Sequence, residues 1–307
     1  MEIKKNDCFT VSIEDMSEDG SGIGKLDGYI WFIKDAVKGD VVEAKAMKMK
    51  KSYGFARLMR VITPSPDRIE PACPVARQCG GCQLQELDYK EQLKFKEKKV
   101  YNHLKRIGGM ENLFLPEEAD QAAGVPDAVI MEPIIGMEDP WRYRNKAQYP
   151  IGRGKDGKPT AGFFAGRTHS LIPVPELDCL LGCAENKDYL AAVLKFMEDF
   201  GVEPYDEANH KGLVRHVLLR KGFASGEHMV CLVINGKKLP HEKEFIERMR
   251  EAGADSISLS FNMEKTNVIL GTEIKNLYGP GYITDKIGNI EYRISPLSFY
   301  QVNPVQT

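Results

Sequence analysis

The stretch CPVARQCGGCQLQ, residues 73–85, divides the chain into an N-terminal part with short strands and a longer mixed part. It places Cys73, Cys79 and Cys82 within ten residues, and two glycines between the last two cysteines allow a tight turn. Disulfides are not expected, because the seven cysteines are an odd number and no export signal opens the chain. Three thiols crowded on one loop of an intracellular protein are typical of a metal or cluster site.

Three ligands from one loop need a fourth, and the only thiols near a plausible second loop are Cys179 and Cys183. Four thiolates suit either a [4Fe–4S] cluster or structural zinc. Zinc ribbons usually supply their ligands as two close pairs, so three near cysteines and one distant one favour the iron–sulfur cluster. The plainer alternative, three unrelated buried thiols, leaves the two glycines unexplained.

Upstream of the cysteines, short runs rich in β-formers alternate with turn residues, which predicts a small closed barrel. The runs are residues 9–13, 29–33, 41–44 and 55–58. We interpret Gly20–Lys25 as a turn between strands rather than a phosphate loop, because no helix follows it. The prolines of residues 63–66 predict a stiff linker and a domain boundary.

Downstream of the cysteines, the pattern predicts a mixed domain. A basic helix is expected over residues 88–107, a solvated loop over 116–126, and two further helices that end at Gly201 and Gly253. Strands are expected at 213–220, 229–234, 257–261 and 268–270. The order strand, strand, helix, strand, strand indicates an antiparallel α+β layer. Cys231 lies in an apolar strand and is expected to be an inert buried thiol.

Composition excludes several classes of protein. The 307 residues, 42% hydrophobic and 28% charged, suit a globular protein of about two domains. No apolar run approaches the ~18 residues of a membrane helix, so no membrane partner is expected and the cytoplasm is the expected compartment. The net charge of -2 excludes a uniformly basic surface. Residues 44–66 nevertheless contain six Lys and Arg residues and no acid, a local basic patch.

The Cys73–Gln85 motif closely resembles the iron–sulfur motif of the RNA uracil-5-methyltransferases, which include the 23S ribosomal RNA (uracil-5-)-methyltransferases and their tRNA relatives. Residues 1–66 resemble the TRAM domain of that family, an OB-like RNA-binding barrel. WRYRNKAQY, residues 141–149, is similar to its Tyr-Arg-Asn-Lys signature, and SPLSFYQVN, residues 295–303, is similar to its Phe-Gln-Val-Asn segment.

The resemblance implies a fold of class β plus α+β. It comprises an N-terminal OB-like TRAM β-barrel (1–66), an iron–sulfur central α+β domain with an antiparallel sheet (67–294), and the start of a methyltransferase domain (295–307). It makes Cys179 the fourth ligand and Cys183 a bystander, so that Cys73, Cys79, Cys82 and Cys179 hold a [4Fe–4S] cluster. It also implies that Gln301 reaches toward the methyl donor, S-adenosylmethionine.

No Gly-rich loop after a strand and no Asp-Pro-Pro-Arg run follows the Phe-Gln-Val-Asn segment. The family's catalytic cysteine and general base are therefore not expected in this chain, and no catalytic residue is assigned. We expect that the chain lacks the C-terminal methyltransferase domain and does not methylate RNA alone.

Two sets of residues are candidates for RNA contact. Lys48, Lys50 and Lys51, followed by Tyr53 and Phe55, combine charge with rings on which bases stack. Arg142, Arg144 and Lys146 alternate, so in an extended segment their side chains would share one face, about 7 Å apart. For both sets the alternative is a solvated charged face.

The sequence thus predicts a monomer that binds and orients 23S ribosomal RNA, without DNA, for methylation of uracil at C5. Two alternatives remain: a tRNA substrate, or a non-enzymatic RNA-binding module with structural zinc. Radical methylthiotransferases also pair a TRAM domain with clusters, but their three cysteines are separated by three and two residues rather than five and two.

Overall fold

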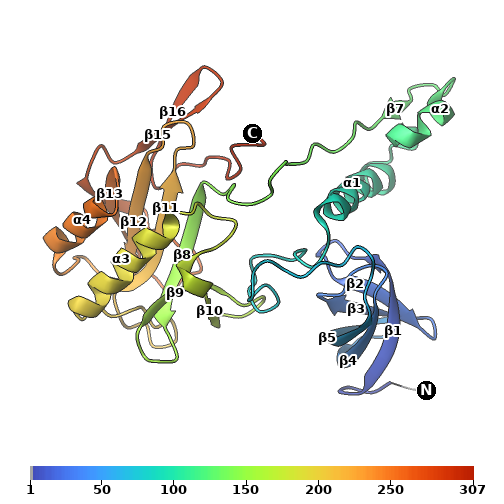
Figure 1. Cartoon of the computed structure of the whole chain (residues 1–307), viewed down its shortest axis with the longest axis horizontal. Helices are drawn as coiled ribbons and strands as arrows, with labels where there is room; N and C mark the ends of the chain where they lie inside the picture. The colour runs from blue at the N-terminus through green and yellow to red at the C-terminus, as the bar shows by residue number, and fades with distance from the viewer. Residues whose placement is uncertain (1–2) are drawn as a thin grey trace. The chain divides into compact units, whose positions relative to one another are not determined.

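The structure is a computed structural model that describes residues 3–307, and it contains two compact units. The first unit comprises the chain to Ala72 together with Cys82–Glu138. The second comprises Cys73–Gly81 and Asp139–Thr307. Figure 1 labels their elements.

The first unit is built on a closed barrel of five strands. These are β1 (Cys8–Met16), β2 (Gly22–Leu26), β3 (Tyr29–Lys34), β4 (Val41–Met49) and β5 (Tyr53–Thr63), in the order β1-β2-β3-β5-β4 (Figure 1). All neighbours are antiparallel except β3 and β5. Alternate residues of each strand fill the interior, as the period of two requires, and Trp31 is the largest of them. The predicted barrel is confirmed.

The interpretation of Gly20–Lys25 as a turn is wrong, because most of it forms strand β2. Its glycines face inward, where a Cβ at Gly22 would lie 2.8 Å from the carbonyl oxygen of Ala36. A Cβ at Gly24 would lie 2.6 Å from a methyl group of Val11. The neighbouring strands leave no room for side chains, so this strand carries glycine where others carry hydrophobic residues.

A buried ion pair ties the end of the barrel to the segment that follows β5. The carboxylate of Asp40 is fully buried and accepts hydrogen bonds from the backbone N–H groups of Val37 (2.7 Å) and Ser65 (2.9 Å). Arg68 donates to it from Nε (3.0 and 3.2 Å) and Nη2 (2.7 Å) and also donates to the carbonyl of Asp35. All hydrogen-bonding positions of the carboxylate are thereby engaged.

The predicted basic helix is confirmed as α1 (Tyr89–Arg106), and Asp88 caps it by accepting from the N–H of Lys90 at 3.0 Å. No residue of α1 is buried. Glu18 of the barrel unit accepts from Lys99 through its backbone carbonyl and from His103 through its carboxylate. Residues 116–126, predicted as a loop, contain η1 (Pro116–Glu118) and α2 (Ala119–Ala122); the short strands β6 (Leu113–Phe114) and β7 (Val129–Ile130) flank them.

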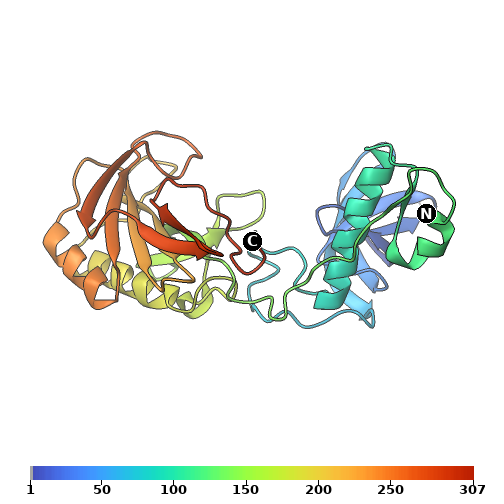
Figure 2. The ribbon, with the colours of Figure 1, turned by 90° about the horizontal axis from the view of Figure 1, so that it is seen from above.

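The second unit contains a sheet of seven strands in the order β10-β9-β8-β11-β12-β13-β14. The strands are β8 (Lys146–Arg153), β9 (Pro159–Phe164), β10 (Leu171–Pro173), β11 (Val214–Lys221), β12 (His228–Ile234), β13 (Ser256–Phe261) and β14 (Glu273–Tyr278). Helices α3 (Asn186–Asp199) and α4 (Glu242–Glu251) lie on one face, and η2 (Pro175–Leu177) follows β10 (Figure 2). The α+β class is confirmed.

Two details of the predicted sheet are wrong. Strands β12 and β13 are parallel, because α4 crosses over between them, so the sheet is not wholly antiparallel. The strand predicted at 268–270 is a loop, and β14 instead covers Glu273–Tyr278. Asn262 holds this loop by donating to the carbonyls of Val268 (2.7 Å) and Ile269 (2.9 Å).

The hairpin of β15 (Ile283–Ile287) and β16 (Ile290–Ile294) contributes to a small second core. Ile283, Ile294 and Tyr300 pack there with Met229 of β12. Across residues 3–307, no helix combines the length and the apolar character needed to cross a bilayer.

Candidate nucleic-acid interface

Three aromatic rings lie together on the outside of the barrel. Phe32 of β3 is opposite Phe55 of β5, with 5.7 Å between ring centroids. Tyr53 contacts both rings edge-on, with centroids 5.8 and 5.7 Å away. Phe32 and Phe55 are half-buried and Tyr53 is 36% exposed. We call these three residues the aromatic patch.

The predicted lysines border the aromatic patch. Lys48 of β4 pairs with Phe55 across the β4–β5 ladder, and Lys48, Lys50 and Lys51 are all exposed. The hydroxyl of Tyr29 fixes this hairpin by donating to the carbonyls of Lys50 (2.7 Å) and Tyr53 (2.5 Å). A rigid surface of rings flanked by cations can stack bases and attract phosphates.

The sequence analysis missed Phe32. The signal was available, because Trp31 and Ile33 of the same strand point inward, so Phe32 must point outward. An outward phenylalanine beside a basic hairpin is a stacking candidate that composition does not reveal.

A second group of cations lies in the second unit, where Lys146 of β8 pairs with Arg220 of β11. Burial lowers the pKa of Lys146, and the charges of Arg220 and Arg144 lower it further. Burial also lowers the pKa of Arg220 to about 10. Among the described residues, no carboxylate shifts the pKa of Lys146 or of Arg220. The thiol of Cys231 is the one other titratable group that affects Arg220 within the described part of the chain. We call Arg144, Lys146 and Arg220 the cation cluster.

The guanidinium of Arg220 is only partly satisfied. The residue is 5% exposed, and its Nη2 donates to the carbonyls of Pro296 (3.3 Å) and Ser298 (2.5 Å). Its Nε is buried and has no partner among the described residues. Clustered cations without a compensating acid favour the binding of an anion such as a phosphate.

Arg142 does not share a face with Arg144 and Lys146, so the predicted row of three cations is wrong. The backbone of Arg142 is left-handed (φ 55°), and its side chain forms a bidentate ion pair with Asp178. This hydrogen bonding lowers the pKa of Asp178. Arg142 also donates to the carbonyl of Cys179 at 3.2 Å, so it braces the loop that carries this cysteine.

The C-terminal segment is held against the sheet by Asn145. Its backbone N–H donates to the carbonyl of Val302 (3.0 Å), and its side chain donates to that of Gln301 (2.9 Å). Asn145 is buried, whereas the side chain of Gln301 is exposed.

The cysteine loop is docked onto the second unit through Gly80. Its N–H donates to the carbonyl of Phe164 at 2.9 Å, and a Cβ at this position would lie 2.7 Å from that oxygen. The backbone of Cys79 forms an isolated antiparallel β-bridge with that of Ala165. The first glycine of the motif therefore has a packing reason, namely this close approach.

Three of the four predicted metal ligands, Cys73, Cys79 and Cys179, belong to the second unit, and Cys82 belongs to the first. Cys73, Cys79, Cys82 and Cys179 are half-buried, and no cysteine within 3–307 forms a disulfide. Over the same range, no three His, Cys, Asp or Glu side chains gather closely enough to hold a metal ion. Cys183 is buried and donates to the carbonyl of Arg144 at 3.4 Å; burial raises its pKa to about 11. Cys231 is buried as expected, and burial raises its pKa to about 11.

The chain is similar to a known domain family over its barrel and to RNA methyltransferases over nearly its whole length. Residues 4–59 match the TRAM domain family. An uncharacterized RNA methyltransferase of Halalkalibacterium halodurans is 44% identical over 99% of this chain and 63% of its own length. One of Clostridium tetani is 42% identical over 99% of this chain and 62% of its own length. The chain thus spans a little under two thirds of the curated relatives it matches.

One solved structure has the same fold over nearly the whole chain. It is the crystal structure of the Pyrococcus abyssi tRNA (uracil-54, C5)-methyltransferase in complex with S-adenosyl-L-homocysteine. The TM-score is 0.71 at 24% identity, covering 97% of this chain and 62% of that one. At this identity, the likeness shows the arrangement of the elements and not the activity.

Proposed function

We propose that this chain binds and orients the RNA substrate of an S-adenosylmethionine-dependent RNA (uracil-C5)-methyltransferase. The aromatic patch with its flanking lysines carries the proposal, because it offers both stacking and charge on one rigid surface of the TRAM-like barrel. The names of two relatives also support the proposal, because both are RNA methyltransferases, at 44% and 42% identity.

The proposed reaction explains why the RNA must be held firmly. Uracil C5 is a poor nucleophile, so a thiolate first adds to C6 and electron density moves to C5. S-adenosylmethionine supplies the methyl group. A base then removes the C5 proton, and the thiolate leaves from C6. The target base must be unstacked to permit this addition, and the stacking and phosphate contacts of this chain would hold the flanking strand in place.

Each set of residues has a proposed role in RNA binding. Lys48, Lys50, Lys51 and Tyr53 contact single-stranded RNA at the barrel. Arg144 and Lys146, joined by Arg220, hold a phosphate. Arg142, also a predicted RNA contact, would act only indirectly, through the Cys179 loop that it braces. Gln301, with its exposed side chain next to the backbone that Asn145 fixes, is the proposed contact to the methyl donor.

The proposed substrate is 23S ribosomal RNA, with tRNA as the alternative. The resemblance of the sequence motifs to the 23S ribosomal RNA methyltransferases supports the first. The name of the Pyrococcus abyssi enzyme, whose structure matches 97% of this chain, is a reason to test the second. Competition between the two RNAs for a labelled oligonucleotide distinguishes them.

Salt dependence tests the proposed function directly. Each phosphate contact to a single strand adds about 0.7 to the slope of log affinity against log salt. The triple variant Lys48→Gln, Lys50→Gln, Lys51→Gln should therefore lower the slope by about 2 and weaken binding of a labelled single-stranded RNA. A control with the same loss of charge, Lys237→Gln, Lys238→Gln, Lys243→Gln, alters exposed lysines of the second unit. Equal slopes for the two variants would contradict the proposal.

We also propose, from the sequence motif, that Cys73, Cys79, Cys82 and Cys179 bind a [4Fe–4S] cluster. Four thiols are the right donors for it, and the Gly80 contact anchors the loop. No group of three candidate ligands is found within residues 3–307, so no functional step is derived from a cluster. Iron and acid-labile sulfide, measured after anaerobic purification, test this proposal. The variant Cys79→Ser should lose both, whereas the control Cys8→Ser, at an exposed cysteine, should keep them. One zinc per chain without sulfide would favour the zinc-containing module instead.

A further inference from the structure

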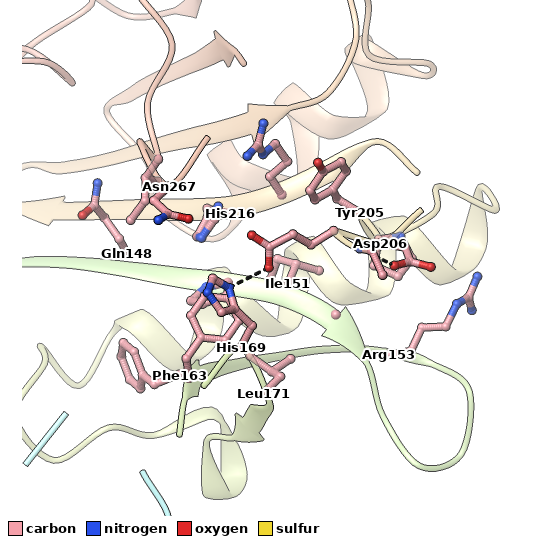
Figure 3. Close-up of a pocket in the computed structure, with 18 of the residues that line it drawn as sticks. Gln148, Ile151, Arg153, Phe163, His169, Leu171, Tyr205, Asp206, His216 and Asn267 are labelled. Atoms are coloured by element: carbon pink, nitrogen blue, oxygen red, sulfur yellow. Dashed lines mark hydrogen bonds and ion pairs between the residues drawn. The ribbon is translucent and has the colours of Figure 1, made fainter. Parts of the chain in front are cut away.

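The second unit contains a pocket of about 830 Å³ that no step above uses. It lies where β8, β9 and β11 meet the loops 204–208 and 266–269 (Figure 3). Its volume is within the range of pockets that enclose small organic ligands. The pocket is within one compact unit, so its walls form a single body.

One side of the pocket presents polar side chains whose hydrogen-bonding groups have no partner within residues 3–307. Gln148 and His216 project from the sheet face opposite α3 and α4, since Tyr149 and Val217 belong to the core under those helices. Asn267 comes from the loop, and Figure 3 shows the three side chains near one another. No hydrogen bond within residues 3–307 engages the side-chain amides of Gln148 and Asn267, and Nδ1 of His216 is buried without a partner.

The imidazole of His216 is a neutral hydrogen-bonding group. Burial and the nearby charge of Arg215 lower the pKa of His216 to about 4, so the imidazole is uncharged at neutral pH. A buried neutral imidazole nitrogen without a partner favours a ligand that offers a hydrogen bond.

The other side of the pocket is apolar and aromatic. Phe163, Phe164 and Leu171 line it from β9 and β10, and Tyr205 lines it from the loop. The ring of His169 lies 5.5 Å from that of Phe164 and is held by Glu207 at 2.8 Å. Flat rings along one wall suit a planar ligand.

The charged residues of the pocket are mostly paired. Both terminal nitrogens of Arg215 donate to carbonyls, to Asn262 and Glu264 at 2.8 Å and to Thr266 at 3.2 Å. The guanidinium also lies 4.5 Å from the ring centre of Tyr205. These bonds fix the loop that carries Asn267, so the pocket is preformed. The charged residues that line the pocket are two arginines, Arg153 and Arg215, and two carboxylates, Asp206 and Glu207, so their charges balance. Lys265 lines an adjoining recess of about 410 Å³.

We propose that this pocket binds one unpaired nucleobase of the RNA strand, with the adjoining phosphate near Lys265. A nucleobase is planar, uncharged and edged with hydrogen-bond donors and acceptors, which matches aromatic walls facing two amides and an imidazole. The pocket would hold a second, non-target base and so fix the register of the RNA. This inference rests on the proposed RNA-binding function.

Two RNA probes test the pocket: decauridylate, and an abasic ribose-phosphate decamer with the same charge but no bases. The variants are Asn267→Ala, at an exposed position that can change without unfolding, and Gln148→Leu. Asn276→Ala, an exposed asparagine on β14 outside the pocket, is the control. Each pocket variant should weaken decauridylate binding by about tenfold, as loss of one bound base does, and leave the abasic decamer unaffected.

Photocross-linking of a decamer containing 4-thiouridine gives an independent result. Peptides that contain Phe163, Phe164 or His169 should carry cross-links, and they should lose them in the Asn267→Ala variant. Unchanged decauridylate affinity in both pocket variants, or cross-links confined to residues 45–57 of the barrel, would overturn the pocket while leaving RNA binding intact. Failure of the wild-type chain to bind either probe would overturn the proposed function together with the pocket.

Discussion

Replacing Arg68 by methionine should strongly destabilise the barrel, because the buried carboxylate of Asp40 then loses its positively charged partner. This carboxylate accepts two hydrogen bonds from backbone N–H groups and three from Arg68. Asp40 is 0% exposed at its side chain and Arg68 is 15% exposed. Removing one partner of such a buried pair costs about 3–5 kcal/mol, since the other charge stays buried and uncompensated.

A second variant shows that the charge, and not the lost packing, is responsible. The double variant Asp40→Asn/Arg68→Met no longer contains the unpaired buried carboxylate, so it should be more stable than Arg68→Met alone. Arg60→Met is the matched control, because Arg60 pairs with Glu43 at 3.0 Å while 70% exposed. An exposed pair of this kind contributes about 1 kcal/mol or less.

Urea unfolding followed by tryptophan fluorescence measures these differences. The chain has two tryptophans, so a Trp141→Phe background leaves Trp31, which is 1% exposed in the barrel core, as the only reporter. With a urea dependence of about 2 kcal/mol per molar, Arg68→Met should lower the midpoint by about 2 M. A midpoint change as small as that of Arg60→Met, or a double variant less stable than the single one, would refute this reasoning.

Four further outcomes are expected. Phe32→Ala should weaken single-stranded RNA binding about tenfold by removing one stacking ring, measured by fluorescence anisotropy; unchanged affinity would remove this residue from the interface. Lys146→Gln should lower the salt slope of RNA binding by about 0.7 if the cation cluster holds one phosphate, and an unaltered slope speaks against it. Gly54→Ala should destabilise the barrel by about 1–3 kcal/mol, because its methyl group would lie 2.5 Å from the ring of Trp31, and urea unfolding checks this cost. The unfolded chain binds a proton at His216 near pH 6.5 and the folded chain only near pH 4, so stability should fall by about 1 kcal/mol per unit as pH decreases through this window; an imidazole titration near 6.5 by NMR would disprove it.

Strands and helices with a clear period were predictable from the sequence, and the reason is burial. The apolar stripe of α3 shows which side of the helix faces the core, and the continuous apolar runs of β11 and β12 indicate strands that are buried on both faces. The strand β2 was not predictable in this way, because Gly22 and Gly24 occupy inward positions without hydrophobic side chains. Glycine usually signals a turn, and here tertiary crowding reverses that meaning.

The candidate sites were predictable where exposure alone decides, and not where a specific contact decides. Lys48 and Tyr53 are exposed as their hairpin position suggests. The position of Arg142 depends on its ion pair with Asp178, 36 residues away, which overrides simple alternation. The cation cluster requires knowledge of the β8–β11 register, which brings Arg220 opposite Lys146. The pocket is assembled from separate loops and strands, so no local pattern announces it.

The glycine-rich strand β2 also determines where the barrel can come apart. It joins β1 and β3 by backbone hydrogen bonds while adding little apolar surface of its own, so its detachment exposes little to water. Its amide protons should therefore exchange with solvent sooner than those of β4. Each such local opening turns a closed cylinder into a sheet with two bare edges, at β1 and β3, and bare edges are where one chain can recruit another into aggregates.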